Sequence, residues 1–286
     1  MSNTCIAFGV FDGVHEGHKA VISKLMEMSV KGYTPVVVSF EYDTELLQDK
    51  KVLSTEMEKE HLIGRLGPEL MISYKIDKHN KDSDIKSFIR DVLVESLGAK
   101  VIVAGKNDCN IMALRECAKS LRYCLEECDT VTSDSGPITS ERIAAEIENN
   151  NLEKVNKLLG HPYIFIGKVM HGKAFGRTVG MPTANLEFGE SKLLPAYGVY
   201  ATLSEIDGKS VKGLTNIGKR PSVDNYDYVT IETFLLDFSG DLYDKIIELQ
   251  VHAFIRSVKK FNGLDEVKSQ VNKDIQSIRE YLDKIS

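Results

Sequence analysis

The chain has 286 residues, of which 42% are hydrophobic and 27% are charged, and its formal net charge is −6. The length suits about two domains, and no apolar run approaches the ~18–20 residues of a membrane-spanning helix. The sequence therefore argues against a membrane protein, and the lack of a basic excess argues against nucleic acid as a partner. No signal peptide is recognisable at the start, so we expect a cytoplasmic protein.

Strand-like and helix-like segments alternate along the first half. Apolar runs rich in β-branched residues predict strands at 5–11, 35–40, 70–76, 101–105 and 123–130. Apolar residues at helical spacing predict helices at 19–30, 56–66, 84–97 and 112–121. This alternation predicts a doubly wound, Rossmann-like α/β domain with a parallel sheet, whose ligands bind at the carboxyl ends of the strands.

Two short helical stretches, 140–148 and 152–159, lead to Gly160-His161-Pro162, which stops the helix. We place the domain boundary there, giving domains 1–160 and 161–286. After it, strands are predicted at 163–170, 198–206, 210–217, 228–237 and 246–258, with turn residues between them. The second domain is thus expected to be an antiparallel β-barrel. Apolar residues stepping by three or four from Leu264 to Leu282 predict a C-terminal helix.

The segment Phe11-Asp12-Gly13-Val14-His15-Glu16-Gly17-His18 lies between the first strand and the first helix. The start of a helix has unpaired N–H groups and favours an anion, so His15 and His18 could hold a phosphate there. The pattern resembles the HxGH motif of nucleotidyltransferases. We take His15 and His18 as candidate catalytic residues. The candidate nucleotide-binding residues beside them are Gly9, Phe11, Asp12 and Gly13. The alternative is a polar turn with one buried histidine.

A glycine-rich segment in the second domain offers another phosphate site. Its candidate ATP-binding residues are Gly172, Lys173, Gly176, Arg177, Thr183 and Asn185. Thr183 and Asn185 alternate on an extended segment, so both point the same way and offer oxygen atoms suited to Mg²⁺. The alternative is a glycine-rich hairpin with no ligand.

Glu232 stands within the strongly apolar run Thr230–Phe238. A carboxylate in such a place can accept the proton of an attacking hydroxyl group. Taken alone, Glu232 fits better as an outward-facing residue of an alternating strand.

Several segments together resemble riboflavin kinases in order and spacing: PTAN (182–185), LLPAYGVYAT (193–202), TNIGKRPS (215–222), IETFLLDF (231–238) and FIRSVKKF (254–261). The whole chain is similar to the prokaryotic bifunctional riboflavin kinase/FMN adenylyltransferase family, also called FAD synthetases. The resemblance implies riboflavin, FMN and ATP as substrates. It also implies Mg²⁺ held by Thr183 and the phosphates, with Asn185 helping. Asn216 joins the ATP-binding residues, and Glu232 is the general base.

The first domain departs from that family in three segments. Phe40-Glu41 lacks the following proline and histidine, Gly105–Asn110 lacks aromatic residues, and a phosphate-binding arginine is replaced by Ala144. Two alternatives therefore stay open beside the bifunctional enzyme. One is a kinase with a non-catalytic first domain, and the other is a non-enzymatic flavin or nucleotide sensor.

The chain has five cysteines, an odd number, and four of them lie at 109, 117, 124 and 128. Their spacings include no Cys-x2-Cys pair, so free thiols are predicted rather than a zinc site. No motif specifies a protein partner or an oligomeric state.

Overall fold

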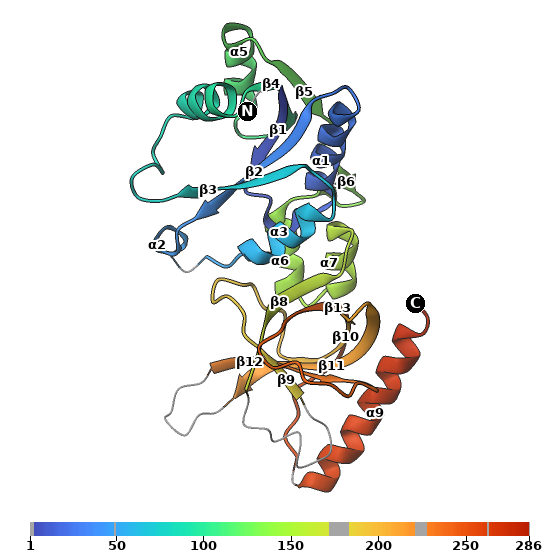
Figure 1. Ribbon diagram of the computed structural model, residues 1–286. Helices are drawn as coiled ribbons and strands as arrows, with labels where there is room; N and C mark the ends of the chain where they lie inside the picture. The colour runs from blue at the N-terminus through green and yellow to red at the C-terminus, as the bar shows by residue number, and fades with distance from the viewer. Residues whose placement is uncertain (1–2, 49, 172–182, 221–227, 262, 286) are drawn as a thin grey trace. The chain divides into compact units, whose positions relative to one another are not determined.

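The structure is a computed structural model, and it describes residues 3–48, 50–171, 183–220, 228–261 and 263–285 (Figure 1). The chain divides into two compact units, residues 1–143 and 144–286. This division comes earlier than the predicted boundary after Gly160. Helix α7 (Leu152–Leu159) packs against strands of the second unit, and its Asn156 donates a hydrogen bond to the Val251 carbonyl.

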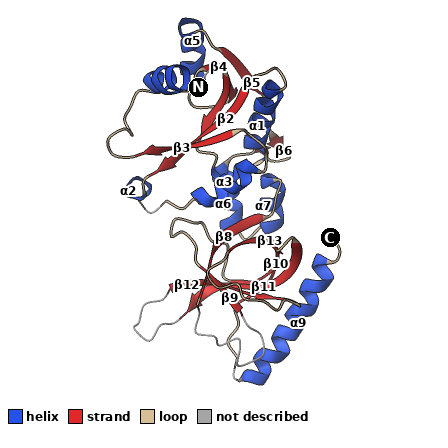
Figure 2. Ribbon diagram, in the orientation of Figure 1, coloured by secondary structure: helices blue, strands red, loops and turns tan. Residues whose placement is uncertain are grey.

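The first unit is built on a five-stranded parallel sheet in the order β3-β2-β1-β4-β5 (Figure 2). Its strands are β1 (Thr4–Gly9), β2 (Thr34–Tyr42), β3 (Leu70–Ile76), β4 (Ala99–Gly105) and β5 (Cys124–Cys128). The central position of β1 brings its carboxyl end between those of two neighbours. In parallel sheets this edge is where ligands bind.

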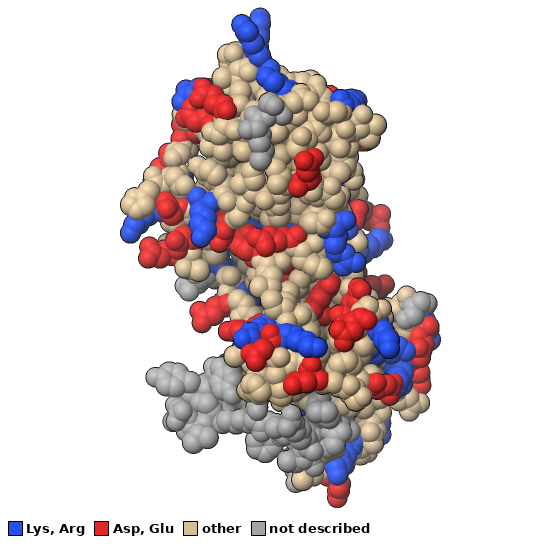
Figure 3. All heavy atoms as spheres, viewed as in Figure 1, with Lys and Arg blue, Asp and Glu red and all other residues tan. Residues whose placement is uncertain are grey.

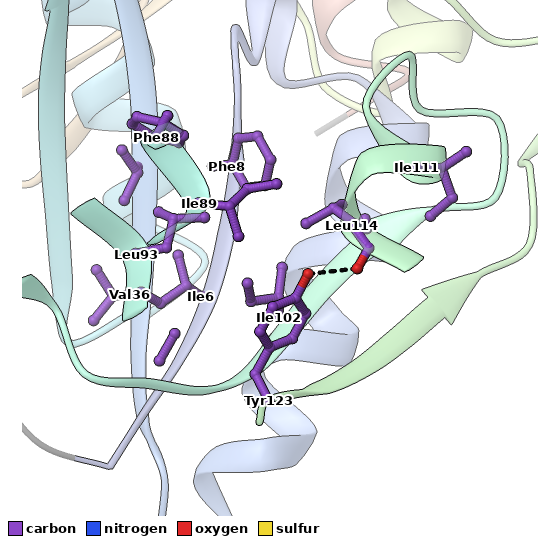
Figure 4. Packing of buried hydrophobic residues seen from close by; sticks show 13 residues of the cluster. Ile6, Phe8, Val36, Phe88, Ile89, Leu93, Ile102, Ile111, Leu114 and Tyr123 are labelled. Atoms are coloured by element: carbon purple, nitrogen blue, oxygen red, sulfur yellow. Dashed lines mark hydrogen bonds between the residues drawn. The ribbon is translucent and has the colours of Figure 1, made fainter. Parts of the chain in front are cut away.

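Helices cover both faces of this sheet, as a doubly wound fold requires. The unit contains η1 (Asp12–Val14), α1 (Glu16–Ser29), α2 (Thr44–Leu47), α3 (Glu56–Gly64), α4 (Ile85–Ser87), η2 (Phe88–Ser96) and α5 (Ile111–Leu121). A short hairpin of β6 (Thr132–Ser133) and β7 (Gly136–Pro137) precedes α6 (Ser140–Glu148). On one face, Phe8 packs with Phe88 of η2, and the Tyr123 hydroxyl donates to the Leu114 carbonyl of α5 (Figure 4). On the other face, the Cys5 thiol contacts the Leu25 carbonyl of α1.

The helix predicted at 84–97 has an α-helical first turn only. From Phe88 to Ser96 it is a π-helix, in which the Leu97 N–H donates to the Val92 carbonyl. The apolar spacing predicts a helix here, but it does not contain the i→i+5 hydrogen-bond pattern, which is rare. The positions expected to face the core, Phe88, Ile89 and Leu93, are buried.

The second unit is a closed antiparallel barrel in the order β10-β11-β12-β9-β8-β13. Its strands are β8 (Tyr163–Met170), β9 (Thr183–Leu186), β10 (Gly198–Ile206), β11 (Lys209–Arg220), β12 (Tyr228–Leu235) and β13 (Ile246–Ser257). Strands β10 and β11 join through Asp207-Gly208, both with positive φ, as a two-residue hairpin turn requires. The predicted α/β domain followed by a β-barrel and a terminal helix is confirmed.

Gly167 in β8 lies close to the backbone at the end of β9. A Cβ atom at this position would lie 1.8 Å from the Glu187 carbonyl oxygen, which is backbone and cannot turn aside. We expect Gly167→Ala to lower the free energy of unfolding of the barrel by about 2 kcal/mol, measured by urea denaturation. Gly64→Ala is the control, because nothing lies within 4 Å of its Cβ position. Equal midpoints for the two variants would contradict the prediction.

The C-terminal helix α9 (Leu264–Leu282) is fastened to the outside of the barrel. Its residues Ile278 and Leu282 are buried with Val199, Ala201, Leu214 and Leu236. Arg256 of β13 holds the buried Asp274 of α9, with Nε 3.1 and 2.9 Å from its two oxygens and Nη2 2.8 Å from Oδ2. This helix therefore marks the outward face of the strands that it covers.

Charged side chains of both signs are interspersed on the face of each unit that Figure 3 shows. Among the residues that the structure describes, no helix is both long enough and apolar enough to cross a membrane.

Candidate active sites

The HxGH segment forms a tight turn between β1 and α1. Phe11, Gly13 and Val14 all have positive φ, at 51°, 79° and 42°. Such a backbone is strained for Phe and for a β-branched Val, and strain of this kind is concentrated at functional sites. Gly9 ends β1 just before the turn, so the whole segment lies at the carboxyl edge of the sheet.

His15 is the N-cap residue of α1. Its Nδ1 accepts hydrogen bonds from the Gly17 and His18 N–H groups, at 3.1 and 3.3 Å. A Cβ at position 17 would lie 3.0 Å from the His15 ring, so a larger residue than glycine would crowd the ring. Because Nδ1 is an acceptor, the neutral ring carries its proton on Nε2. His15 can therefore donate a hydrogen bond to a phosphate oxygen through Nε2.

The His18 ring stacks on that of His15, with centroids 3.7 Å apart and an angle of 16°. Phe11 packs edge-on against His18 at 5.3 Å. Burial holds the pKa of His18 well below its ordinary value, and electrostatic interactions with His15 and Lys59 lower it further. Its Nδ1 is buried and has no hydrogen-bond partner. The His18 ring is therefore neutral, so the pair offers polar ring atoms and not positive charge. A ligand that bonds to His18 Nδ1 would supply its missing hydrogen-bond partner.

Asp12 supports this turn from within. Its carboxylate accepts hydrogen bonds from the Leu53 and Ser54 N–H groups at 3.0 and 2.8 Å, and its carbonyl accepts one from the Ser140 hydroxyl at 2.8 Å. The carboxylate that was predicted to bind nucleotide therefore fastens the segment before α3 to the HxGH turn.

Removing the Asp12 carboxylate should leave two backbone N–H groups without their charged acceptor. We expect Asp12→Ala to lower the free energy of unfolding of the first unit by about 2 kcal/mol. Thermal unfolding of the full chain measures this effect, with the exposed Asp82→Ala as control. A melting temperature equal to that of the control would show that these two hydrogen bonds contribute nothing to stability.

In the barrel, strand register brings three predicted residues into one row. Glu232 of β12 pairs with Asn216 of β11 on one side and with Asn185 of β9 on the other. Thr183 lies two residues before Asn185 on β9, so its side chain points to the same face. All four residues are partly exposed. Gly172, Lys173, Gly176 and Arg177 lie outside the described residues.

This row lies on the outer face of the barrel. Leu214 and Phe234, each two residues from a member of the row, pack in the cluster under α9. The neighbouring Thr215 and Thr233 point inward, fully buried, and their hydroxyls form a chain with that of Thr202, at 2.9 and 2.8 Å. Glu232 is thus not buried within the barrel, in agreement with the outward-facing alternative. It faces outward beside polar neighbours.

The oxygen atoms of this face suit a magnesium ion. A threonine hydroxyl and two asparagine amide oxygens are neutral hard ligands, which leave room for the phosphates that accompany Mg²⁺. Among the described residues no group of three His, Cys, Asp or Glu side chains suits a metal, and the five cysteines are free thiols.

Family models match both units. A riboflavin kinase model matches residues 159–282, and an FAD synthetase model matches residues 1–142. A bifunctional riboflavin kinase/FMN adenylyltransferase of Listeria monocytogenes is 31% identical over 99% of this chain and 94% of its own length. One from Bacillus subtilis is 32% identical over 98% of this chain and 93% of its own length. The chain belongs to the bifunctional riboflavin kinase/FMN adenylyltransferase family.

A crystal structure of a chain described as a macrolide-efflux protein from Streptococcus pneumoniae has the same fold. Its TM-score is 0.82 at 26% identity, over 97% of this chain and 94% of that one. The similarity to this solved structure therefore covers both units of the chain.

Polar side chains in and near the segments 105–110 and 139–144 form local hydrogen bonds and ion pairs. Arg142, two residues before Ala144, donates to the Gly136 and Pro137 carbonyls at 2.8 and 2.9 Å and to the Ser133 hydroxyl at 2.7 Å. Its guanidinium is thus committed to the β6–β7 hairpin. Lys106 likewise pairs with Asp129, and Asn107 with Thr130.

Sequence reasoning missed Lys59 of α3, whose side chain is almost completely buried at the carboxyl edge of the sheet. The signal was present, since Lys59 precedes Leu62 and Ile63 by the helical spacing of a buried face. A lysine at a core-facing position is rare unless its charge is paired.

Proposed function

We propose that this chain makes flavin nucleotides by two reactions. In the second unit, the 5′-hydroxyl of riboflavin attacks the γ-phosphorus of ATP, giving FMN and ADP. In the first unit, a phosphate oxygen of FMN attacks the α-phosphorus of ATP, giving FAD and pyrophosphate. The observation that carries the first reaction is the row Asn216–Glu232–Asn185 with Thr183 on the same face.

In the kinase reaction, Glu232 accepts the proton of the riboflavin hydroxyl as its oxygen attacks. Thr183 and Asn185 would hold the metal ion together with the ATP phosphates, and Asn216 would contact the nucleotide. A bound Mg²⁺ neutralises charge on the transferring phosphoryl group. The inward chain of threonine hydroxyls fixes the strands behind the row, so the side chains are positioned before substrate binds.

In the adenylyl transfer, no protein nucleophile is required. His15 donates its Nε2 proton as a hydrogen bond to a phosphate oxygen, and His18 contributes the unpartnered ring nitrogen. The start of α1 adds backbone N–H groups to the same place. These contacts stabilise negative charge that develops as pyrophosphate leaves.

A kinase whose first unit is not catalytic is the second candidate. Ala144 and the commitment of Arg142 to the hairpin favour it, because both remove a guanidinium from the phosphate site.

Incubating the full chain with riboflavin, excess ATP and Mg²⁺, and separating the flavins by chromatography, tests both functions. FMN followed by FAD is the expected result. FMN that accumulates without FAD would favour the second candidate, and unchanged riboflavin would overturn the kinase assignment.

A further inference from the structure

Lys59 joins the carboxyl ends of two strands. Its side chain is 3% exposed, and its Nζ donates to the Val10 carbonyl at 3.3 Å, the Ser39 hydroxyl at 3.3 Å and the Phe40 carbonyl at 3.2 Å. Val10 directly follows β1, and the other two residues belong to β2. One buried ammonium group thus fixes the spacing of the strands at the edge where ligands bind.

The same ammonium is paired with Glu56, one helical turn earlier, at 2.6 Å from Oε1. The second oxygen of Glu56 is buried and makes no hydrogen bond, and burial raises the pKa of this carboxyl group. Burying the Lys59 ammonium is costly even though the Glu56 side chain keeps about a third of its surface exposed, and an apolar residue at position 59 would avoid that cost. A buried lysine beside an unsatisfied carboxylate oxygen is therefore a poor choice for stability alone.

Lys59 also acts on the histidine pair. The carbonyl that it holds belongs to the residue before Phe11, whose ring packs on His18. Its charge is one of the causes that lower the pKa of His18.

We propose that Lys59 is a positioning residue of the phosphate site, because its ammonium fixes the backbone from which the HxGH turn begins. This inference rests on the proposed adenylyl transfer in the first unit. The expected substrate group is the triphosphate of ATP, which is bound by the turn that Lys59 supports and experiences its positive charge.

Lys59→Met in the full chain tests the proposal, since methionine keeps an unbranched apolar side chain of nearly the same length and removes the charge. FAD formation from FMN and ATP should fall at least tenfold in kcat, while riboflavin phosphorylation by the same chain stays within twofold. The pKa of His18, followed by NMR of its ring protons, should rise. Lys24→Met is the matched control, because Lys24 forms an i,i+3 pair with Glu27 on an exposed helix surface. FAD formation within twofold of wild type, or an unchanged His18 pKa in a folded variant, would overturn the proposal.

A measurement on the wild-type chain covers the case in which Lys59→Met fails to fold. The ¹⁵N-labelled lysine ammonium signals are recorded while α,β-methylene-ATP and Mg²⁺ are added. The Lys59 signal should shift on saturation and the Lys24 signal should not. A Lys59 signal that stays in place would overturn the proposal. Absence of FAD formation by the wild-type chain would instead count against the proposed function of the first unit, and the Lys59 signal would still decide the inference.

Discussion

Glu232→Gln is expected to lower the rate of FMN formation by about 10³-fold, because the amide cannot accept the proton of the riboflavin hydroxyl. The shape of the side chain and the pairing of β12 with β9 and β11 remain, so the barrel should keep its stability. The rate is measured by chromatography of FMN under saturating ATP and Mg²⁺.

A measurement of flavin binding distinguishes loss of the proton acceptor from loss of riboflavin affinity. Riboflavin affinity, measured by fluorescence titration, should change little in Glu232→Gln. The exposed Glu205 of β10 provides the control, and Glu205→Gln should phosphorylate riboflavin at the wild-type rate. A wild-type rate in Glu232→Gln would remove Glu232 from the role of base and leave catalysis to the phosphate contacts.

His15→Ala should have two separable effects on the first unit. Loss of the Nε2 donor should slow FAD formation by about 10²-fold. Loss of the N-cap acceptor for Gly17 and His18 should lower the free energy of unfolding by about 1 kcal/mol. Initial rates of FAD formation from FMN and urea denaturation measure the two.

His15→Ser separates the two effects, because serine is a good N-cap residue but its side chain ends well short of the imidazole Nε2. We expect this variant to regain most of the stability and none of the FAD formation. Riboflavin phosphorylation should be normal in both variants. FAD formation at the wild-type rate in His15→Ser would mean that the ring of His15 serves only to cap α1.

Much of the fold could be read from periodicity. The strand–helix alternation predicted the parallel sheet, and the regular turns after Gly160 predicted the barrel. What the sequence could not supply was register. Asn185, Asn216 and Glu232 come from three separate segments, and only the pairing of β9, β12 and β11 puts them side by side.

Two site features depended on three-dimensional surroundings that a linear pattern does not contain. The apolar run around Glu232 did not decide whether its side chain has polar neighbours. The apolar residues on its own face lie under α9, whereas Glu232 stands beside Asn216 and Asn185. Asp12 is predicted to bind nucleotide because it adjoins HxGH, and nothing in the sequence indicated that its carboxylate also accepts N–H groups more than forty residues away. Hydrogen bonds across such distances follow from tertiary packing alone.

Synthesis of the barrel must run to its last strand before the ring can close. Strand β13, residues Ile246–Ser257, pairs with β8 on one edge and with β10 on the other, and α9 follows it. The parallel sheet of the first unit is complete once β5 has emerged, well before any strand of the barrel. A nascent chain therefore carries a finished first unit together with an open set of strands that has two unpaired edges. Such edges can pair with other chains, so this is the stage of synthesis most exposed to aggregation.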